Sequence, residues 1–539
     1  MRKNHIWLPL IISLCISAGF LLATWTGSPF HNGINSTAQT NKLSAILSLI
    51  EQDYAEEVNI DSLTEALIPL LLEQLDPHSS YIPLEDFNEV NDPLQGSFEG
   101  IGVEFSIQND TITVMRVIAG GPSERVKIRA GDRIVTVNDS VVAGISITNS
   151  KVMKLLKGAK GSKVRVGIKR QGTAQLIDFE ITRDKIPLNS IRASYMIDKE
   201  IAYLKLENFA FTTPKEFTEH IAQLRTQGMK KIIIDLRENG GGALNSAVFL
   251  ANEFLAKGDL IVFTQGKNYA REDFRADGKG SCQDLGLAVL INEFSASASE
   301  VFAGAIQDND RGIIVGRRSF GKGLVNRDFM LYDNSAVRLT IQKFYTPSGR
   351  CIQKPFADGI DAYNNDLEQR ILHGELEHSD SISFPDSLQF KTRAGRIVHG
   401  GGGIMPDFFV PIDTTGYSSY LSLLENRGII YDFAFSFADK HREQLSKIKT
   451  IEEVIAFCER ENAYNQLLRF AEKKGIAVNK EQEQISRRII KQRLHAYIVR
   501  SALGNESLFY KIINENDKTV LRAVEQLRTA KPSTKLMKN

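Results

Sequence analysis

The sequence contains few cysteines and no closely spaced pair of them. Its 539 residues include four, namely Cys15, Cys282, Cys351 and Cys458. Zinc sites built from CxxC pairs and dense disulfide scaffolds both need a richer pattern, so the sequence excludes these two classes. Whether Cys282 and Cys351 form a disulfide is left undecided by the sequence.

An excess of charge of one sign is also lacking. Lysine and arginine number 66 against 65 aspartates and glutamates, which gives a net charge of +1. Proteins that bind nucleic acids usually carry a basic excess or a basic stripe, so we expect no nucleic-acid partner. A chain of this length exceeds one ordinary domain, and its 42% hydrophobic and 24% charged residues are typical of folded domains.

Long apolar runs are absent except at the N-terminus. Residues 6–25 form one such run, and Arg2 and Lys3 precede it. About 20 apolar residues are enough to cross a bilayer, and a basic flank before an apolar core is typical of an export signal or membrane anchor. We therefore predict a signal peptide or signal anchor over residues 1–26, followed by a linker over 27–40. The alternative is a buried core helix. The prediction places the protein in the periplasm or cell envelope, with residues 6–25 as a membrane contact.

Hydrophobic periodicity divides the rest of the chain. Apolar residues recur at helical spacing between Leu43 and Leu75, whereas Val164, Val166 and Ile168 alternate as in a strand. Short continuous apolar runs such as Ile232–Ile234 are typical of buried parallel sheets. The predicted parts are a helical domain (41–92), a small β domain (93–185), an α/β core (186–415) with a polar insertion (355–400), a C-terminal helical region (416–530) and a disordered tail (531–539).

A serine-rich turn follows the apolar run Leu287–Ile291. Ser295, Ser297 and Ser299 stand there, at the start of a predicted helix. The first N–H groups of a helix have no intrahelical partner, and they can stabilise an oxyanion that forms when a serine attacks a carbonyl. The residues from Ser297 to Glu300 also fit a capping box, which this segment alone favours over a nucleophile.

A serine nucleophile needs a base, and the nine histidines form no constellation that would supply one. A lysine can serve when its pKa is lowered from about 10.4 to about 7–8 by burial. Lys322 is the best candidate, because Gly321 and Gly323 flank it among apolar residues. The segment ending at Lys322 also fits most of a phosphate-binding loop. Gly323, however, stands where that loop needs Ser or Thr, and a strand pattern follows, so nucleotide binding is disfavoured.

Several ordered motifs together resemble the carboxyl-terminal processing peptidases, also called tail-specific proteases. The resemblance spans about residues 41–412 and implies a multidomain α+β protein. Its parts would be an α/β core of the crotonase/ClpP-like type, an inserted PDZ-like β domain, and N- and C-terminal helical regions. It implies no metal and no cofactor. The matching segments are residues 75–81, 100–103, 130–134, 235–244, 295–300, 319–325, 345–350 and 403–407.

The resemblance assigns roles to individual residues. It implies Ser297 as the nucleophile and Lys322 as the base, and it reverses the preference for a simple helix cap. It also implies an oxyanion hole from the N–H groups of Ala298 and Gly241. The family usually has Gln four residues after the lysine, where this chain has Asn326. On a predicted strand this amide faces the same side as the lysine, but it is one methylene shorter, so weak activity is one expectation.

The β domain resembles a PDZ domain, which binds a peptide C-terminus by strand addition while loop N–H groups hold the carboxylate. The implied peptide-binding residues are Gly100, Ile101, Gly102 and Val103, and the implied partners are proteins with apolar C-terminal tails. The sequence thus favours a serine endopeptidase that selects substrates by their tails. The main alternative is a tail-binding scaffold with a weak or inactive site, and a crotonase-type acyl-CoA enzyme is a third.

Overall fold

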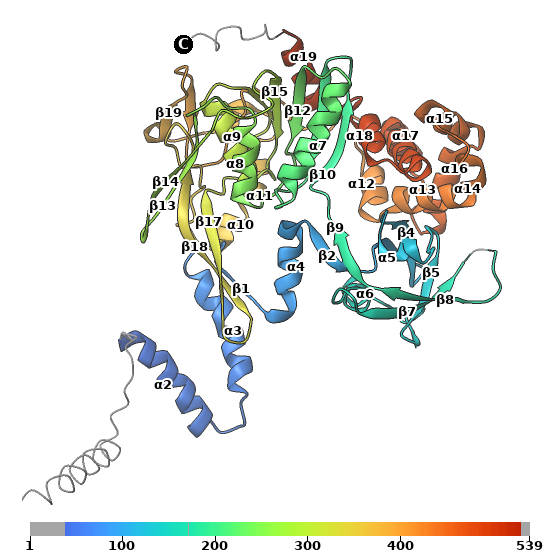
Figure 1. Cartoon of the computed structure of the whole chain (residues 1–539), viewed down its shortest axis with the longest axis horizontal. Helices are drawn as coiled ribbons and strands as arrows, with labels where there is room; N and C mark the ends of the chain where they lie inside the picture. The colour runs from blue at the N-terminus through green and yellow to red at the C-terminus, as the bar shows by residue number, and fades with distance from the viewer. Residues whose placement is uncertain (1–37, 171, 530–539) are drawn as a thin grey trace, which may run out of the picture. The chain divides into compact units, whose positions relative to one another are not determined.

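A computed structural model describes residues 38–170 and 172–529, and the chain divides into two units, Met1–Gln74 and Leu75–Asn539. Among the described residues, the first unit holds the helices α2 (Ala38–Asp53) and α3 (Ile60–Glu73) (Figure 1). Asn59 caps the start of α3, accepting a hydrogen bond from Ser62 N at 2.9 Å. No helix of the described residues is long and apolar enough to span a bilayer. The apolar run at residues 6–25 lies outside the described residues.

The β domain of the second unit is built on one antiparallel sheet with the strand order β3-β4-β5-β7-β8. Alternate residues of its strands point into one core, where Ile112, Val114, Val166 and Ile168 are fully buried. The predicted strand alternation is therefore confirmed, and β3 lies at the edge of the sheet. The elements are β2 (Ser97–Gly100), β3 (Val103–Gln108), β4 (Thr111–Val117), α5 (Pro122–Arg125), β5 (Arg133–Val137), β6 (Ser140–Val141), α6 (Asn149–Leu156), β7 (Lys163–Lys169), β8 (Ile177–Thr182) and β9 (Asp184–Pro187).

The α/β core is organised around a sheet with the strand order β10-β11-β12-β15-β16-β21. Strands β11, β12, β15 and β16 pair in parallel, which explains their continuous apolar sequences, because both faces of such a sheet are buried. The elements are β10 (Ile191–Met196), β11 (Ile201–Leu206), α7 (Thr213–Thr226), β12 (Lys231–Asp235), α8 (Leu244–Asn252), β15 (Gly286–Ile291), α9 (Ala298–Asp308), β16 (Ile313–Gly316) and β21 (Phe408–Phe409).

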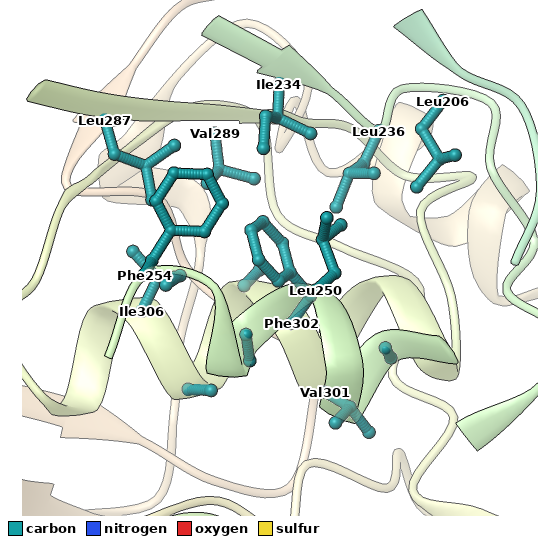
Figure 2. Packing of buried hydrophobic residues seen from close by; sticks show 14 of the residues in the cluster. Leu206, Ile234, Leu236, Leu250, Phe254, Leu287, Val289, Val301, Phe302 and Ile306 are labelled. Atoms are coloured by element: carbon teal, nitrogen blue, oxygen red, sulfur yellow. The ribbon is translucent and has the colours of Figure 1, made fainter. Parts of the chain in front are cut away.

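Helices α7, α8 and α9 cover one face of this sheet. Leu250 of α8 and Phe302 of α9 lie against Ile234 and Val289 of the sheet, and all four side chains are fully buried (Figure 2). Helix α9 is buried along its whole length. The helix that begins at the serine-rich turn is thus held rigidly in the core.

The last helix, α19 (Lys518–Thr529), covers the other face of the same sheet. Its buried side chains pack in one apolar cluster with residues of β12, β15 and β16. Helix α19 follows a separate bundle, so the core includes a segment about 100 residues beyond its predicted span of 186–415. The cluster includes Val520, Ala523, Val524 and Leu527 of α19 and Ile233, Ala288, Leu290 and Val315 of the sheet.

A bundle of the remaining C-terminal helices has its own hydrophobic core, which confirms the predicted C-terminal helical region. Its elements are α12 (Ser419–Asn426), α13 (Ile429–Lys440), α14 (Arg442–Leu445), α15 (Ile451–Arg460), α16 (Ala463–Lys473), α17 (Lys480–Leu503) and α18 (Glu506–Asn514).

A second sheet of the core has the order β1-β18-β13-β14, with β17 paired to β18. The polar insertion contains short helices and one hairpin. Cys282, Cys351 and Cys458 are all free thiols. The elements are β1 (Ser80–Ile82), β13 (Leu260–Gly266), β14 (Tyr269–Arg275), β17 (Leu324–Met330), β18 (Ala336–Tyr345), α10 (Ile360–Asn364), α11 (Asp366–Leu372), β19 (Gln389–Lys391) and β20 (Ile397–His399).

Candidate active site

One cavity of about 690 Å³ in the second unit is lined by all five residues to which the sequence assigns a catalytic or oxyanion role. They come from three places in the chain: the turn after β12, the start of α9, and the segment that enters β17. The cavity also has apolar walls, including Leu244, Val301 and Phe344. The five residues are Gly241, Ser297, Ala298, Lys322 and Asn326.

Ser297 occupies the corner between β15 and α9. It is the N-cap residue of α9, but its φ of 56° and ψ of −114° lie outside the extended region that N-caps ordinarily adopt. A non-glycine residue with this backbone is strained by about 1–3 kcal/mol and needs surrounding structure to hold it. Among the described residues, the N–H of Ala298 has no hydrogen-bond acceptor. Strain and a free N–H are both expected at a nucleophilic corner and are unnecessary for a simple cap.

The carboxylate of Glu300 connects the two halves of the site. One oxygen accepts hydrogen bonds from Ser297 N at 2.8 Å and Lys322 N at 2.9 Å. The other accepts from Gly321 N at 2.7 Å and the Ser319 hydroxyl at 2.6 Å. Burial raises the pKa of Glu300 to about 7, and the four hydrogen bonds limit the rise. A residue that the sequence indicated only as part of a capping box thus fixes the main chain of both Ser297 and Lys322.

Glu300→Gln should weaken this connection while conserving the shape of the side chain. The new NH2 group cannot accept a hydrogen bond, so two of the four donors lose their partner. Each unsatisfied buried donor costs about 1–3 kcal/mol. We expect the free energy of unfolding in urea to fall by about 2–5 kcal/mol and kcat to fall at least tenfold, because Ser297 and Lys322 are no longer held in register.

Glu293→Gln serves as the matched control. Glu293 also lies next to the serine-rich turn and is also buried, but it pairs with Arg317 at 2.8 Å rather than with the main chain of Ser297 or Lys322. Its loss is expected to reduce stability with kcat within about threefold of wild type. Equal kcat losses in the two variants would contradict the role assigned to Glu300.

Lys322 is half-buried and has no acidic partner within 4.0 Å among the described residues. Burial lowers the pKa of its amine, and the positive charge of Arg338 lowers it further, while Asp76 and Glu300 act in the opposite direction. The strand predicted to include Lys322 begins only at Leu324, and a β-bulge between Val325 and Asn326 interrupts the alternation. Lys322 and Asn326 nevertheless line the same cavity.

The orientation of the Asn326 amide is determined by its neighbours. Its nitrogen donates to Thr340 Oγ1 at 3.0 Å and lies 3.4 Å from the His78 carbonyl oxygen. Thr340 in turn donates its hydroxyl proton to Asp76 at 3.1 Å. A carbonyl oxygen can only accept, so the NH2 group must face it. The amide oxygen of Asn326 therefore remains as an acceptor, which is the group that an amine N–H needs as a partner.

Gly241 lies against Ser297, but its N–H is engaged in a hydrogen bond. A Cβ on this residue would lie 2.8 Å from Ser297 Cβ and 3.0 Å from Ala298 N, so only glycine fits. Its N–H donates to Asn239 Oδ1 at 2.9 Å. The expected role of Gly241 as an oxyanion donor is therefore not met in this conformation, because the Asn239 side chain already accepts that proton. In the described chain, the N–H groups of Gly240 and Gly242 have no acceptor.

Sequence reasoning assigned no role to Asp76, His78, Thr340 or Asn239. The first two belong to a motif that carried the family resemblance, but a motif does not show which side chains meet. His78 Nε2 lies 2.7 Å from the Tyr363 hydroxyl. Burial, together with the charge of Lys322, lowers the pKa of His78 to about 4, so this histidine is neutral at physiological pH.

The predicted peptide-binding residues gather at the start of β3. Gly100 is the last residue of β2, where it pairs with Asp184, so the loop itself consists of Ile101 and Gly102. The Ile101 carbonyl accepts hydrogen bonds from both the N–H and the hydroxyl of Ser123. Gly102 has a φ of +75°. Val103 opens strand β3, which lies at the edge of the sheet.

Comparison with known proteins agrees with this geometry. The sequence profile of Peptidase family S41 matches residues 200–362, that of the PDZ domain matches 100–181, and that of a family of unknown function matches 420–504. The carboxy-terminal processing protease CtpA of Bacillus subtilis is 32% identical over 348 residues, which are 64% of this chain and 74% of that protein. The chain belongs to the carboxy-terminal processing proteases of Peptidase family S41, a family of serine proteases.

Further relatives and solved structures extend the comparison. A probable CtpA-like serine protease of Staphylococcus aureus (strain bovine RF122 / ET3-1) is 33% identical over 325 residues, 60% of this chain. The chain spans 64% of the length of that relative. Among solved structures, the photosystem II D1 C-terminal processing protease has 22% identity, covers 70% of this chain and 95% of its own, and gives a TM-score of 0.35.

Proposed function

We propose that this protein is a serine endopeptidase that uses Ser297 as nucleophile and Lys322 as general base. The observation that carries the proposal is the shared cavity. A serine on a strained helix-opening corner faces the same space as a lysine with a lowered pKa and no acidic partner among the described residues. The crotonase-type alternative has no comparable support, because acyl-CoA chemistry does not need a neutral lysine beside a serine.

The proposed reaction follows from these groups. The neutral amine of Lys322 takes the proton of Ser297 Oγ as that oxygen attacks the peptide carbonyl. The negative charge that develops on the carbonyl oxygen is received by the N–H of Ala298 at the start of α9. Lys322 returns the proton to the leaving amine, and an acyl-enzyme ester remains on Ser297. Water, deprotonated by the same amine, then hydrolyses the ester.

The contacts of Asn326 favour the enzyme hypothesis over the hypothesis of an inactive scaffold. Its amide is shorter than the glutamine usual in the family, and this difference motivated the scaffold alternative. The contacts with Thr340 and the His78 carbonyl hold the amide with its oxygen free to accept a hydrogen bond. The shorter side chain is thus held by a surrounding network, which supports its use in orienting Lys322.

The test uses purified protein and a fluorophosphonate reagent, which reacts covalently with activated serines. Mass spectrometry should locate the label on Ser297, and labelling should stop cleavage of an unfolded substrate with an apolar tail. Ser297→Ala serves as the unlabelled control. Cleavage that survives complete labelling of Ser297 would refute the proposal. Tail binding without any labelling or cleavage would establish the scaffold.

Substrate selection by apolar C-terminal tails is part of the same proposal. The edge strand β3 offers a side for strand addition, and apolar side chains such as Phe105 and Ile107 stand on it. We propose further that the substrates are exported proteins and that the protein acts in the periplasm or cell envelope. The apolar run at residues 6–25 supports this location and an attachment to the membrane.

Amidation of a tail peptide should weaken its binding about tenfold or more. The amide removes the carboxylate that the Ile101–Gly102 loop is proposed to hold, and a hydrogen bond to a charged group contributes about 1.5–3 kcal/mol. Fluorescence anisotropy with the Ser297→Ala protein measures affinity without cleavage, and the free-acid form of the same peptide is the control. Equal affinities for the free-acid and amidated peptides would show that the loop does not bind the terminal carboxylate.

A further inference from the structure

Arg237, in the turn after β12, lies between two carboxylates from distant parts of the chain. Asp235 binds it from the end of the same strand, with Arg237 Nη2 at 2.6 Å from Asp235 Oδ2. Asp517 binds the other side, with Arg237 Nη1 at 2.8 Å. The side chains of Arg237 and Asp517 are only 18% and 20% exposed. The guanidinium is therefore held from both sides by carboxylates and is largely shielded from water. Charge-assisted hydrogen bonds of this kind fix the orientation of the guanidinium group.

Asp517 has two structural tasks, one on each carboxylate oxygen. Oδ1 accepts hydrogen bonds from Thr519 N at 2.8 Å and Val520 N at 3.0 Å, which caps the first turn of α19. Oδ2 holds Arg237. Because α19 is anchored on the second face of the central sheet, the position of Asp517 relative to the turn is set by the packing of that helix.

The turn that Arg237 begins runs directly to the nucleophile. The Asn239 carbonyl accepts hydrogen bonds from Ala296 N at 3.0 Å and the Ser299 hydroxyl at 2.9 Å. Two residues later, Gly241 lies against Ser297 and Ala298. The turn also contains Glu238, whose φ of 61° is unfavourable for a side-chain-bearing residue. A turn with this strain keeps its shape only when its ends are held, and Arg237 is at one of them.

We propose that Asp517 is a positioning residue for peptide hydrolysis: through Arg237 it holds the turn Leu236–Gly241 against the nucleophile corner. The inference rests on the proposed function and adds a residue from the C-terminal helical segment to the active machinery. Asp517 touches no reacting atom. Its effect is to hold the glycine turn against Ser297 and Ala298, and the N–H of Ala298 is the proposed donor to the developing oxyanion.

The experiment compares Asp517→Asn with Lys518→Ala. Asparagine is as good a helix cap as aspartate, but it loses the charge that pairs with Arg237. Lys518→Ala removes a neighbouring ion pair, to Asp413 at 2.8 Å, that has no contact with the turn. Rates are expressed per active site titrated with fluorophosphonate, which removes the contribution of unfolded protein. We expect Asp517→Asn to lower kcat at least tenfold with KM within twofold, and Lys518→Ala to leave both within twofold.

Equal kcat values per titrated site in Asp517→Asn and wild type would overturn the proposal, as would equal losses in both variants. If Asp517→Asn does not fold, Asp517→Glu replaces it, because it retains the charge while displacing the carboxylate by one methylene. We expect folded protein with kcat reduced at least threefold, and an unchanged kcat would overturn the proposal. Failure of the proposed function is separate, since wild-type protein would then show no serine-dependent cleavage.

Discussion

Replacing Lys322 with methionine should lower kcat for cleavage of a tail-bearing substrate by roughly 10²–10⁴-fold, the usual contribution of a general base. Methionine conserves the length and apolar stem of the side chain but cannot accept the proton of Ser297. Tail-peptide affinity should stay within twofold, because the PDZ domain is unchanged. Burst kinetics with an active-site titrant measure the acylation rate directly. An acylation rate within threefold of wild type would show that another group takes the proton.

The pH dependence gives an independent measure of the same amine. Burial and Arg338 lower the pKa of Lys322, so the neutral, active form is present above that pKa and is lost as the pH falls through it. The rate should therefore decrease toward acid pH. Arg338→Gln removes a positive charge near Lys322 and leaves Asp328 without its ion-pair partner, so the pKa of Lys322 should rise. The fall in rate toward acid pH should then begin at a higher pH. A control substitution at the exposed Arg327 of the neighbouring strand β17 should leave the pH dependence unchanged.

A chain that ends at residue 515 should fail to form a stable core. Without α19, the sheet residues beneath it face water, and three large buried side chains of the helix are lost: Val520, Val524 and Leu527. Burial of each such side chain contributes about 1.5–3 kcal/mol. Their sum of about 5 kcal/mol or more equals the whole stability of many domains, which is about 5–15 kcal/mol. Circular dichroism and urea unfolding should show a partly unfolded protein without peptidase activity.

Point substitutions in α19 measure the same effect in a folded protein. Leu527→Ala should lower the free energy of unfolding by about 2–5 kcal/mol, because it leaves a cavity against the sheet. Leu521→Ala, on the exposed side of the same helix, has a side chain that is 50% exposed and should stay within about 0.5 kcal/mol of wild type. Equal losses at the two positions would show that α19 does not stabilise the core through this face.

Local sequence patterns were sufficient for strands such as β7, β12 and β15, and for choosing Ser297 and Lys322 as candidates. The alternation in β7 reflects a strand with one buried face, and the continuous apolar runs of β12 and β15 reflect strands with two buried faces. Each of these patterns occupies only a few consecutive residues. The serine corner and the Gly-Lys-Gly segment were located by motif. Their meeting depends on Glu300, a hydrogen-bond acceptor whose partners lie up to 22 residues away and which no short pattern reveals.

Other features could not be predicted because they depend on tertiary contacts. The ion pair between Arg237 and Asp517 joins residues 280 positions apart. The engagement of the Gly241 N–H depends on which way the Asn239 side chain turns. The bulge at Val325 and Asn326 arises where β17 adjusts its pairing with β18. In each case the deciding partner is a group whose position is set by packing rather than by neighbouring sequence.

The place of α19 on the central sheet also bears on how the protein comes into being. A ribosome delivers this helix after all other described elements, so a nascent chain carries Ser297 and Lys322 on a sheet with one bare face. Under the proposed function, we expect hydrolytic competence to arise only when translation of the helix is complete. This order of elements would keep an unfinished chain from hydrolysing the nascent polypeptides around it.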